Sequence, residues 1–213
     1  MKYGVFGGTF DPIHMGHLRT AEEMVEQLGL AKLFLIPAAS PPHKYHSPVS
    51  DFRHRYEMAR IAVGKSSTLE VLDIEAKRDG PSYSVDTINE LISLLGPQDD
   101  LYFILGIEGF LEIHTWKEYR YLFTRTHIVV VDRQGHQYDE VFSYLRGLEI
   151  HFELTKDPDK IILGTGRLLL HRSSTRMDIS SSQIRDLVRK GRSIRYLVPD
   201  QVMDYVVANR LYR

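Results

Sequence analysis

The sequence predicts an α/β protein built on an open, mostly parallel sheet that is wound on both sides by helices. Short apolar segments alternate with amphipathic segments along the 213 residues, and such strand–helix repetition favours parallel strands joined by helical crossovers. The apolar segments show little alternation with polar residues, as expected of strands buried on both faces. Ligands bind such sheets at the carboxyl ends of the strands, where the strand order reverses. The chemistry is therefore expected in loops that follow strands.

Composition and charge fit one globular domain. Hydrophobic residues make up 43% of the chain and charged residues 26%, which is the ordinary balance. The absence of cysteine excludes disulfides, thiolate zinc sites and cysteine nucleophiles. A net charge of −1 supports neither nucleic-acid nor membrane binding, and no segment resembles a signal peptide or a membrane span. We expect one cytoplasmic domain over residues 1–213, with a small helical portion from about 180 to 213 and possible homo-oligomerisation.

Six segments rich in Val, Ile, Leu and Phe are predicted to be strands. They are Tyr3–Phe6, Lys32–Ile36, Leu69–Ile74, Leu101–Leu105, Ile128–Asp132 and Leu168–His171. Helical spacing fills several of the intervals between them. The segment 18–28 repeats apolar residues three and four apart, and Gly29 closes it. Further helices are predicted over Asp51–Val63, over Ser84–Leu95 with Ser84 as the N-cap, and from Pro199 in the first turn of the last helix.

The segment Gly7–His17, which reads GGTFDPIHMGH, follows the first strand and opens the first helix. Two glycines let the backbone come close to a ligand, and the helix N-terminus offers N–H groups and a positive dipole end to phosphate. His14 and His17 are three residues apart, so their imidazoles share one helix face. Two such donors can hold the oxygens of a triphosphate while charge builds up in a transition state.

Simpler interpretations of this segment exist. A Gly-Gly turn is a common connection between a strand and a helix. Two histidines three apart could also be part of a zinc site, but such a site needs further ligands and cysteine is absent. The glycine spacing matches neither a dinucleotide-binding fingerprint nor a P-loop. The combination of features is more specific than any one of them.

A second group of polar residues lies near the C-terminal end of the sequence. Ser180 and Gln183 have the spacing of a capping box, so a helix is predicted to start there. Its N–H groups, the serine hydroxyls and the forked guanidinium of Arg185 would form a second phosphate cradle. The alternative is that the serines only cap a helix and that Arg185 points into solvent.

The two segments together resemble the signatures of the HxGH nucleotidyltransferases. Gly7–Pro12 followed by His14-x-Gly16-His17 is similar to the first signature, and Ile179–Arg185 to the second. The resemblance implies a Rossmann-like fold and direct in-line transfer of a nucleotidyl group, with pyrophosphate leaving. It implies no metal-ligating side chains, because Mg²⁺ would be held through the ATP phosphates and water.

Further segments resemble the bacterial nicotinate-nucleotide adenylyltransferases in particular. These are Pro41–Lys44, Gly80–Thr87, Leu105–Glu108 and Thr115–Lys117. This resemblance implies transfer of the adenylyl group of ATP to nicotinate mononucleotide, which gives nicotinate adenine dinucleotide and pyrophosphate in NAD biosynthesis. The residues that it implies for catalysis are His14, His17, Lys44 and Arg185. Those that it implies for ATP are Gly7, Gly8, Thr9, Phe10, Gly106, Glu108, Ser181 and Ser182. Those that it implies for nicotinate mononucleotide are Tyr83, Ser84, Trp116 and Arg133.

The chemistry of the residues agrees with these roles. Trp116, the sole tryptophan, offers an aromatic face for stacking on an electron-poor pyridinium ring, although tryptophan is more often a core or interface residue. The N–H groups of Tyr83 and Ser84, at a helix start, could bind a carboxylate. Arg133, at a strand end, could contact the acceptor's phosphate or be an ordinary surface residue.

The sequence departs from the family pattern at three positions, and two other functions compete. Glu108 stands in place of aspartate, Ser84 in place of threonine and Gln134 in place of proline.

Phosphopantetheine adenylyltransferases share the first motif but are shorter and lack the Thr-Trp and Ser-Tyr elements. A non-catalytic nucleotide-binding regulator would be expected to lose a histidine of the first motif or Arg185, and all three are present.

Overall fold

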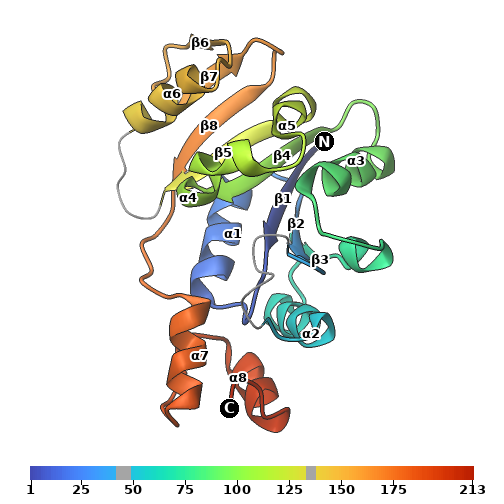
Figure 1. The fold of residues 1–213 in the computed structure, drawn as a ribbon, viewed down its shortest axis with the longest axis vertical. Helices are drawn as coiled ribbons and strands as arrows, with labels where there is room; N and C mark the ends of the chain where they lie inside the picture. Colours follow the sequence, from blue (N-terminus) through green and yellow to red (C-terminus); the bar gives the residue numbers. More distant parts are fainter. Residues whose placement is uncertain (42–48, 133–137) are drawn as a thin grey trace.

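The computed structural model describes residues 1–41, 49–132 and 138–213, and within these ranges eight strands form one sheet. The strands lie in the order β3-β2-β1-β4-β5-β8-β7-β6 (Figure 1). Their bounds are β1 Lys2–Gly8, β2 Lys32–Pro37, β3 Leu69–Val71, β4 Asp100–Gly106, β5 His127–Asp132, β6 Phe152–Leu154, β7 Lys160–Leu163 and β8 Leu168–Ser173.

The sheet is parallel from β3 to β8, and among the described strands β7 pairs antiparallel with β8 and β6 pairs antiparallel with β7. The chain runs outward from β1 to β2 and β3, and then returns to β4 on the other edge of β1 and continues to β5. The strand order therefore reverses between β1 and β4, which is where ligands bind in sheets of this kind. The predicted α/β fold with a doubly wound, mostly parallel sheet is confirmed.

Helices lie on both faces of the sheet (Figure 1). Their bounds are α1 Met15–Leu28, α2 Phe52–Val63, α3 Ser84–Leu94, α4 Ile107–Leu111, α5 Tyr119–Arg125, α6 Tyr138–Gly147, α7 Ser181–Arg189 and α8 Asp200–Ala208, with 3-10 helices η2 Ile74–Lys77 and η3 Ile113–Thr115. In the ranges that the structure describes, no helix combines the length and the apolar character needed to cross a membrane.

Buried apolar side chains form a cluster on each face of the sheet. Successive residues of a strand point to opposite faces. Leu33 and Leu35 of β2 accordingly pack with α1, α2, α7 and α8, whereas Phe34 and Ile36 pack with α3, α4, α5 and α6. Burying one such side chain stabilises the fold by roughly 1.5–3 kcal/mol. With both faces covered, the strand ends are the places left for polar chemistry.

The structure corrects three of the predicted boundaries. The strand predicted over Leu69–Ile74 ends at Val71, because this edge strand pairs only with β2 and the chain then turns into η2. Ser84 is the first residue of α3 rather than its N-cap, since Tyr83 holds the extended cap conformation. Pro199 is likewise the N-cap of α8 and not part of its first turn. Gly29 closes α1 in the left-handed conformation, as predicted, with φ 62.

Several elements are absent from the predictions. The strands β6 and β7 have 3 and 4 residues and extend the sheet beyond β8. In β7, Ile161 and Leu163 are buried whereas Ile162 is exposed, so apolar residues face both solvent and core. Such a short apolar run does not distinguish a strand from a helix by periodicity. The short helices α4 and α5, and α6, are also absent from the predictions.

His127 at the start of β5 is expected to make stability depend on pH. Its Nδ1 accepts a hydrogen bond from the Leu168 N–H at 3.0 Å, and the ring lies against Tyr102. Burial lowers the pKa of His127, although Asp100 near Nε2 favours the charged form. Protonation would place a hydrogen on Nδ1, opposite the Leu168 N–H. We therefore expect the free energy of unfolding to fall as the pH drops below about 6.5, because the unfolded state binds the proton first.

Urea unfolding between pH 7.5 and pH 5 measures this effect when wild type is compared with His127→Asn. The asparagine can still accept the Leu168 hydrogen bond but does not titrate in this range. We expect the wild type to lose more stability than the variant over the interval. Equal losses would show that His127 does not carry the effect.

Candidate active site

A cavity of about 520 Å³ opens at the switch point of the sheet. Gly7 and Gly8 at the end of β1 line it, as do Phe103, Ile104 and Leu105 of β4. Because β1 and β4 are the strands between which the order reverses, the cavity lies where open α/β sheets bind ligands. A Cβ at Gly8 would stand 2.9 Å from the Phe10 ring, so this close approach requires glycine.

One wall of this cavity carries three of the residues predicted to hold the acceptor. Tyr83 and Ser84 line it at the start of α3, and Trp116 lines it after η3. Lys117 links the segment after η3 to the start of α3. Its Nζ is 3.1 Å from Asp86 of α3 and 4.9 Å from the centre of the Tyr83 ring. A flat ring entering the cavity would therefore meet an aromatic side chain and a helix N-terminus together.

Glu75 is a lining residue that the sequence did not reveal. This side chain of η2 is 9% exposed, and its Oε1 accepts a hydrogen bond from the Thr87 hydroxyl at 2.6 Å. Its Oε2 is buried, and among the described residues it has no hydrogen-bond partner. Glu75 thus brings a buried carboxylate into the wall of the cavity. The single glutamate in Ile74–Lys77 carries no spacing signal that would predict this.

A second, polar cavity of about 280 Å³ adjoins the first, and Thr9 lines both. Its other lining residues come from both predicted motifs: Asp11, His14, His17, Ile179, Ser180, Ser181, Ser182 and Arg185. The two imidazoles stack with their centres 3.6 Å apart. Imidazoles, hydroxyls and a guanidinium therefore converge on one small space, and such groups suit the oxygens of a polyphosphate.

The first turn of α1 sets the orientation of His17. Its Nδ1 accepts a hydrogen bond from the His14 backbone N–H at 3.3 Å. A neutral imidazole that accepts at Nδ1 carries its proton on Nε2, so Nε2 is the donor. The Phe10 ring packs edge-on against His17, with the ring centres 5.0 Å apart, and Phe10 itself is 2% exposed. The side chain of Phe10 thus supports His17 from the core and does not line the cavity.

Two hydrogen bonds fasten the second motif to the first. The Ser181 hydroxyl donates to the Pro12 carbonyl at 2.9 Å, and Arg185 Nη1 donates to the Asp11 carbonyl at 2.7 Å. The N-cap predicted at Ser180 is confirmed, since its side chain accepts from the Gln183 N–H. Segments 169 and 174 positions apart in the chain thus form one wall of the polar cavity.

A third cavity of about 520 Å³ continues from the polar one, and Ile179 and Ser180 line both. Glu108 in the first turn of α4 and Gln183 of α7 both line it. The three cavities therefore follow one another across the carboxyl ends of the strands. Their shared lining residues place the donor-rich cavity in the middle.

Arg55 of α2, which the sequence also did not reveal, organises the loops around these cavities. It is 1% exposed, and its guanidinium donates to four backbone carbonyls. These belong to Ser50, Thr9, Ala38 and Ala39, at distances of 2.6–3.2 Å. One buried cation thus joins the turn after β1, the loop after β2 and the segment before α2.

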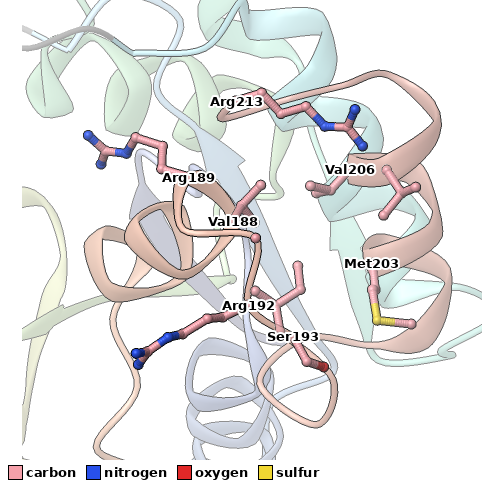
Figure 2. A pocket seen from close by; sticks show the side chains of 10 residues that line it. Val188, Arg189, Arg192, Ser193, Met203, Val206 and Arg213 are labelled. Atoms are coloured by element: carbon pink, nitrogen blue, oxygen red, sulfur yellow. The ribbon is translucent and has the colours of Figure 1, made fainter.

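A separate cavity of about 480 Å³ lies between α7 and α8 (Figure 2). Val188, Val206 and Arg213 lie around it, whereas the guanidinium groups of the lining residues Arg189 and Arg192 point away from it. Its lining residues belong to neither predicted motif. Within the part of the chain that the structure describes, the three contiguous cavities at the strand ends are therefore the candidate active site.

Some predicted site residues are not among those lining the cavities. Lys44 and Arg133 lie outside the described residues, as do Gln134 and most of the loop that carries Lys44. Gly106 ends β4 and is the N-cap of α4, so it sets the position of Glu108.

Comparisons with known proteins give a consistent picture. The profile of the cytidylyltransferase-like family matches residues 5–187. The probable nicotinate-nucleotide adenylyltransferase of Geotalea daltonii is 42% identical over 213 residues, which cover 100% of this chain and 98% of that protein. The corresponding protein of Desulfatibacillum aliphaticivorans is 41% identical over 223 residues, with 100% of both chains covered.

Solved structures share the fold at lower identity. The nicotinic acid mononucleotide adenylyltransferase of Plasmodium falciparum, complexed with NaAD, aligns with a TM-score of 0.76 at 19% identity, covering 99% of this chain and 97% of that one. A putative nicotinate-nucleotide adenylyltransferase from Vibrio parahaemolyticus aligns with a TM-score of 0.65 at 14% identity, covering 100% and 95%. At these identities the likeness concerns the fold.

The role of Arg55 can be measured as a loss of stability. Arg55→Met keeps the buried aliphatic stem but leaves four carbonyls without their charged donor. We expect the free energy of unfolding to fall by about 3 kcal/mol in urea titrations. The control is Arg53→Met on the same helix, where the side chain is 89% exposed and little change is expected. Equal effects of the two substitutions would contradict the role given to Arg55.

Proposed function

The chain belongs to the nicotinate-nucleotide adenylyltransferases within the cytidylyltransferase-like family, and from this premise we propose that the three contiguous cavities hold the acceptor, the phosphates and the adenosine of one reaction. The protein transfers the adenylyl group of ATP to nicotinate mononucleotide, which yields nicotinate adenine dinucleotide and pyrophosphate in NAD biosynthesis. The observation that carries the assignment of the cavities is the position of the donor-rich cavity between two larger ones.

The reaction is a single displacement at phosphorus. An oxygen of the 5′-phosphate of nicotinate mononucleotide attacks the α-phosphorus of ATP, and a new P–O–P linkage forms. The bond between the α-phosphorus and the oxygen bridging to the β-phosphorus breaks, and pyrophosphate leaves in line. No covalent intermediate with the protein is needed, because positioning and charge neutralisation supply the catalysis.

The polar cavity is assigned to the phosphates. His17 Nε2, the imidazole of His14 and the Arg185 guanidinium supply donors there, with the hydroxyls of Ser181 and Ser182 beside them. Lys44 is proposed to join them from the loop after β2. Mg²⁺ enters as part of the MgATP substrate, coordinated by phosphate oxygens and water. The imidazole, hydroxyl and guanidinium groups fit this arrangement, because they bind the remaining phosphate oxygens.

The two flanking cavities are assigned to the two nucleosides. Trp116 is proposed to stack on the pyridinium ring, with the N–H groups of Tyr83 and Ser84 at the nicotinate carboxylate. Arg133 is proposed to contact the acceptor's phosphate. Thr9, which lines both the acceptor cavity and the polar cavity, and the backbone at Gly7 and Gly8 are proposed to bind the phosphates. In the third cavity Glu108 is proposed to contact the ATP ribose or adenine.

We also propose that the protein acts in the cytoplasm, because its reaction consumes ATP.

His17→Ala tests the assignment of the polar cavity. We expect the variant to fold and kcat to fall roughly 10²–10³-fold, because one preorganised donor to the transferring phosphate is lost. The measurement is pyrophosphate release from ATP and nicotinate mononucleotide, with thermal unfolding as the check on folding. His151→Ala, at an exposed position before β6, is the control and should keep wild-type activity. A drop of less than about threefold for His17→Ala would remove this residue from the mechanism.

The acceptor site is expected to prefer nicotinate to nicotinamide mononucleotide. A carboxylate gains from the N–H groups and the dipole at the start of α3, whereas a neutral amide gains less. The ratio of kcat/KM for the two acceptors, measured with saturating ATP, tests this preference. Equal efficiency with both acceptors would contradict the proposed carboxylate site at Tyr83 and Ser84.

A further inference from the structure

The carboxylate of Asp11 is buried in the wall of the polar cavity. The residue is 2% exposed, and each carboxylate oxygen has its own donor. Oδ1 accepts a hydrogen bond from the Tyr212 hydroxyl at 2.8 Å, and Oδ2 accepts one from the Ser50 N–H at 3.2 Å. The backbone carbonyl of Asp11 accepts from Arg185 Nη1 at 2.7 Å. The guanidinium assigned to the phosphates is therefore bound to the residue that carries this anion.

Tyr212 reaches Asp11 from 201 positions away, in the segment after α8. Its backbone has φ 64, a left-handed conformation that a tyrosine rarely adopts. Burial, with the charge of Asp11, raises the pKa of Tyr212 well above its ordinary value, so the hydroxyl remains a neutral donor at physiological pH. The Arg185 charge also acts on this hydroxyl, which puts the guanidinium in its neighbourhood.

Two arginines near Asp11 differ in how many donors they have left. Arg55 attracts Asp11 electrostatically, but its Nε, Nη1 and Nη2 already donate to four carbonyls. Toward the described residues the Arg185 guanidinium donates to the Asp11 carbonyl and to the Ser182 hydroxyl, and so keeps donors for a ligand. If Oδ1 lost its donor, a buried carboxylate without that partner would favour a hydrogen bond from Arg185.

We propose that Tyr212 is a positioning residue for adenylyl transfer. Its hydroxyl donates a hydrogen bond to Asp11 Oδ1, so that this oxygen does not compete for the Arg185 guanidinium, which remains directed at the triphosphate. The proposal rests on the proposed function, because it assumes that Arg185 contacts the phosphates. Tyr212 does not touch the substrate. It acts by removing a competitor for the charged donors of Arg185.

A double-mutant cycle tests the proposal with Y212F, D11N and D11N/Y212F. In the chain with Asp11, Y212F is expected to lower kcat/KM for ATP about tenfold, because one hydrogen bond to a charged group is lost. The KM for nicotinate mononucleotide should stay within about twofold, since its cavity is lined by other residues. In the D11N background the competing charge is gone, and Y212F should then change kcat/KM for ATP less than about twofold.

Y205F is the matched control. The Tyr205 hydroxyl lies 3.0 Å from His54 Nδ1 and joins α8 to α2 outside the three cavities. Y205F therefore removes a hydroxyl contact from the same part of the chain and should leave kcat/KM for ATP unchanged. Thermal unfolding of all variants gives the folded fraction.

Three results would overturn the proposal. The first is that Y212F lowers kcat/KM for ATP equally in the chain with Asp11 and in the D11N chain. The second is a loss from Y205F as large as that from Y212F. The third is a loss that follows the folded fraction with both KM values unchanged, since a purely structural role would produce it. The wild type is assayed first with ATP and nicotinate mononucleotide, so that failure of the proposed function is distinguished from failure of the role of Tyr212.

Discussion

The candidate site depends on the two hydrogen bonds that fasten the start of α7 to the turn after β1. Ser181 and Arg185 reach the carbonyls of Pro12 and Asp11, and together with the buried Ile184 they fix the place of the second motif relative to the histidines. Main-chain carbonyls are suitable anchors, because their positions are set by the backbone of the turn and not by a flexible side chain. The wall of the polar cavity is therefore as rigid as the turn itself.

Buried side chains that do not line the cavities support the turn after β1. The Phe10 ring supports His17, and Arg55 binds the Thr9 carbonyl together with carbonyls of two other loops. Catalysis by positioning requires donors that do not have to reorganise during the reaction. A buried cation that donates to four backbone carbonyls gives such rigidity, and its charge offsets the buried carboxylate of Asp11 nearby.

Local signals in the sequence predict much of this architecture, but only where the physics is local. Strands such as β5, with six buried residues, and caps such as Ser180 and Gly29 follow from neighbouring residues alone. The two phosphate-binding segments could be predicted because each combines a turn, a helix start and donors within a few residues. β6 and β7 could not, because their pairing with β8 is a tertiary effect that outweighs weak local preferences.

The same distinction separates the site residues that the sequence indicates from those that it does not. Glu75, Arg55 and Tyr212 occur in ordinary helical or irregular segments, and their importance arises from what lies across the fold: Thr87, the loop carbonyls and Asp11. A buried polar side chain is stable only when it is hydrogen-bonded, so each marks a place where distant segments must meet accurately. The motif residues supply the chemistry of the site, and these buried partners fix the geometry in which that chemistry works.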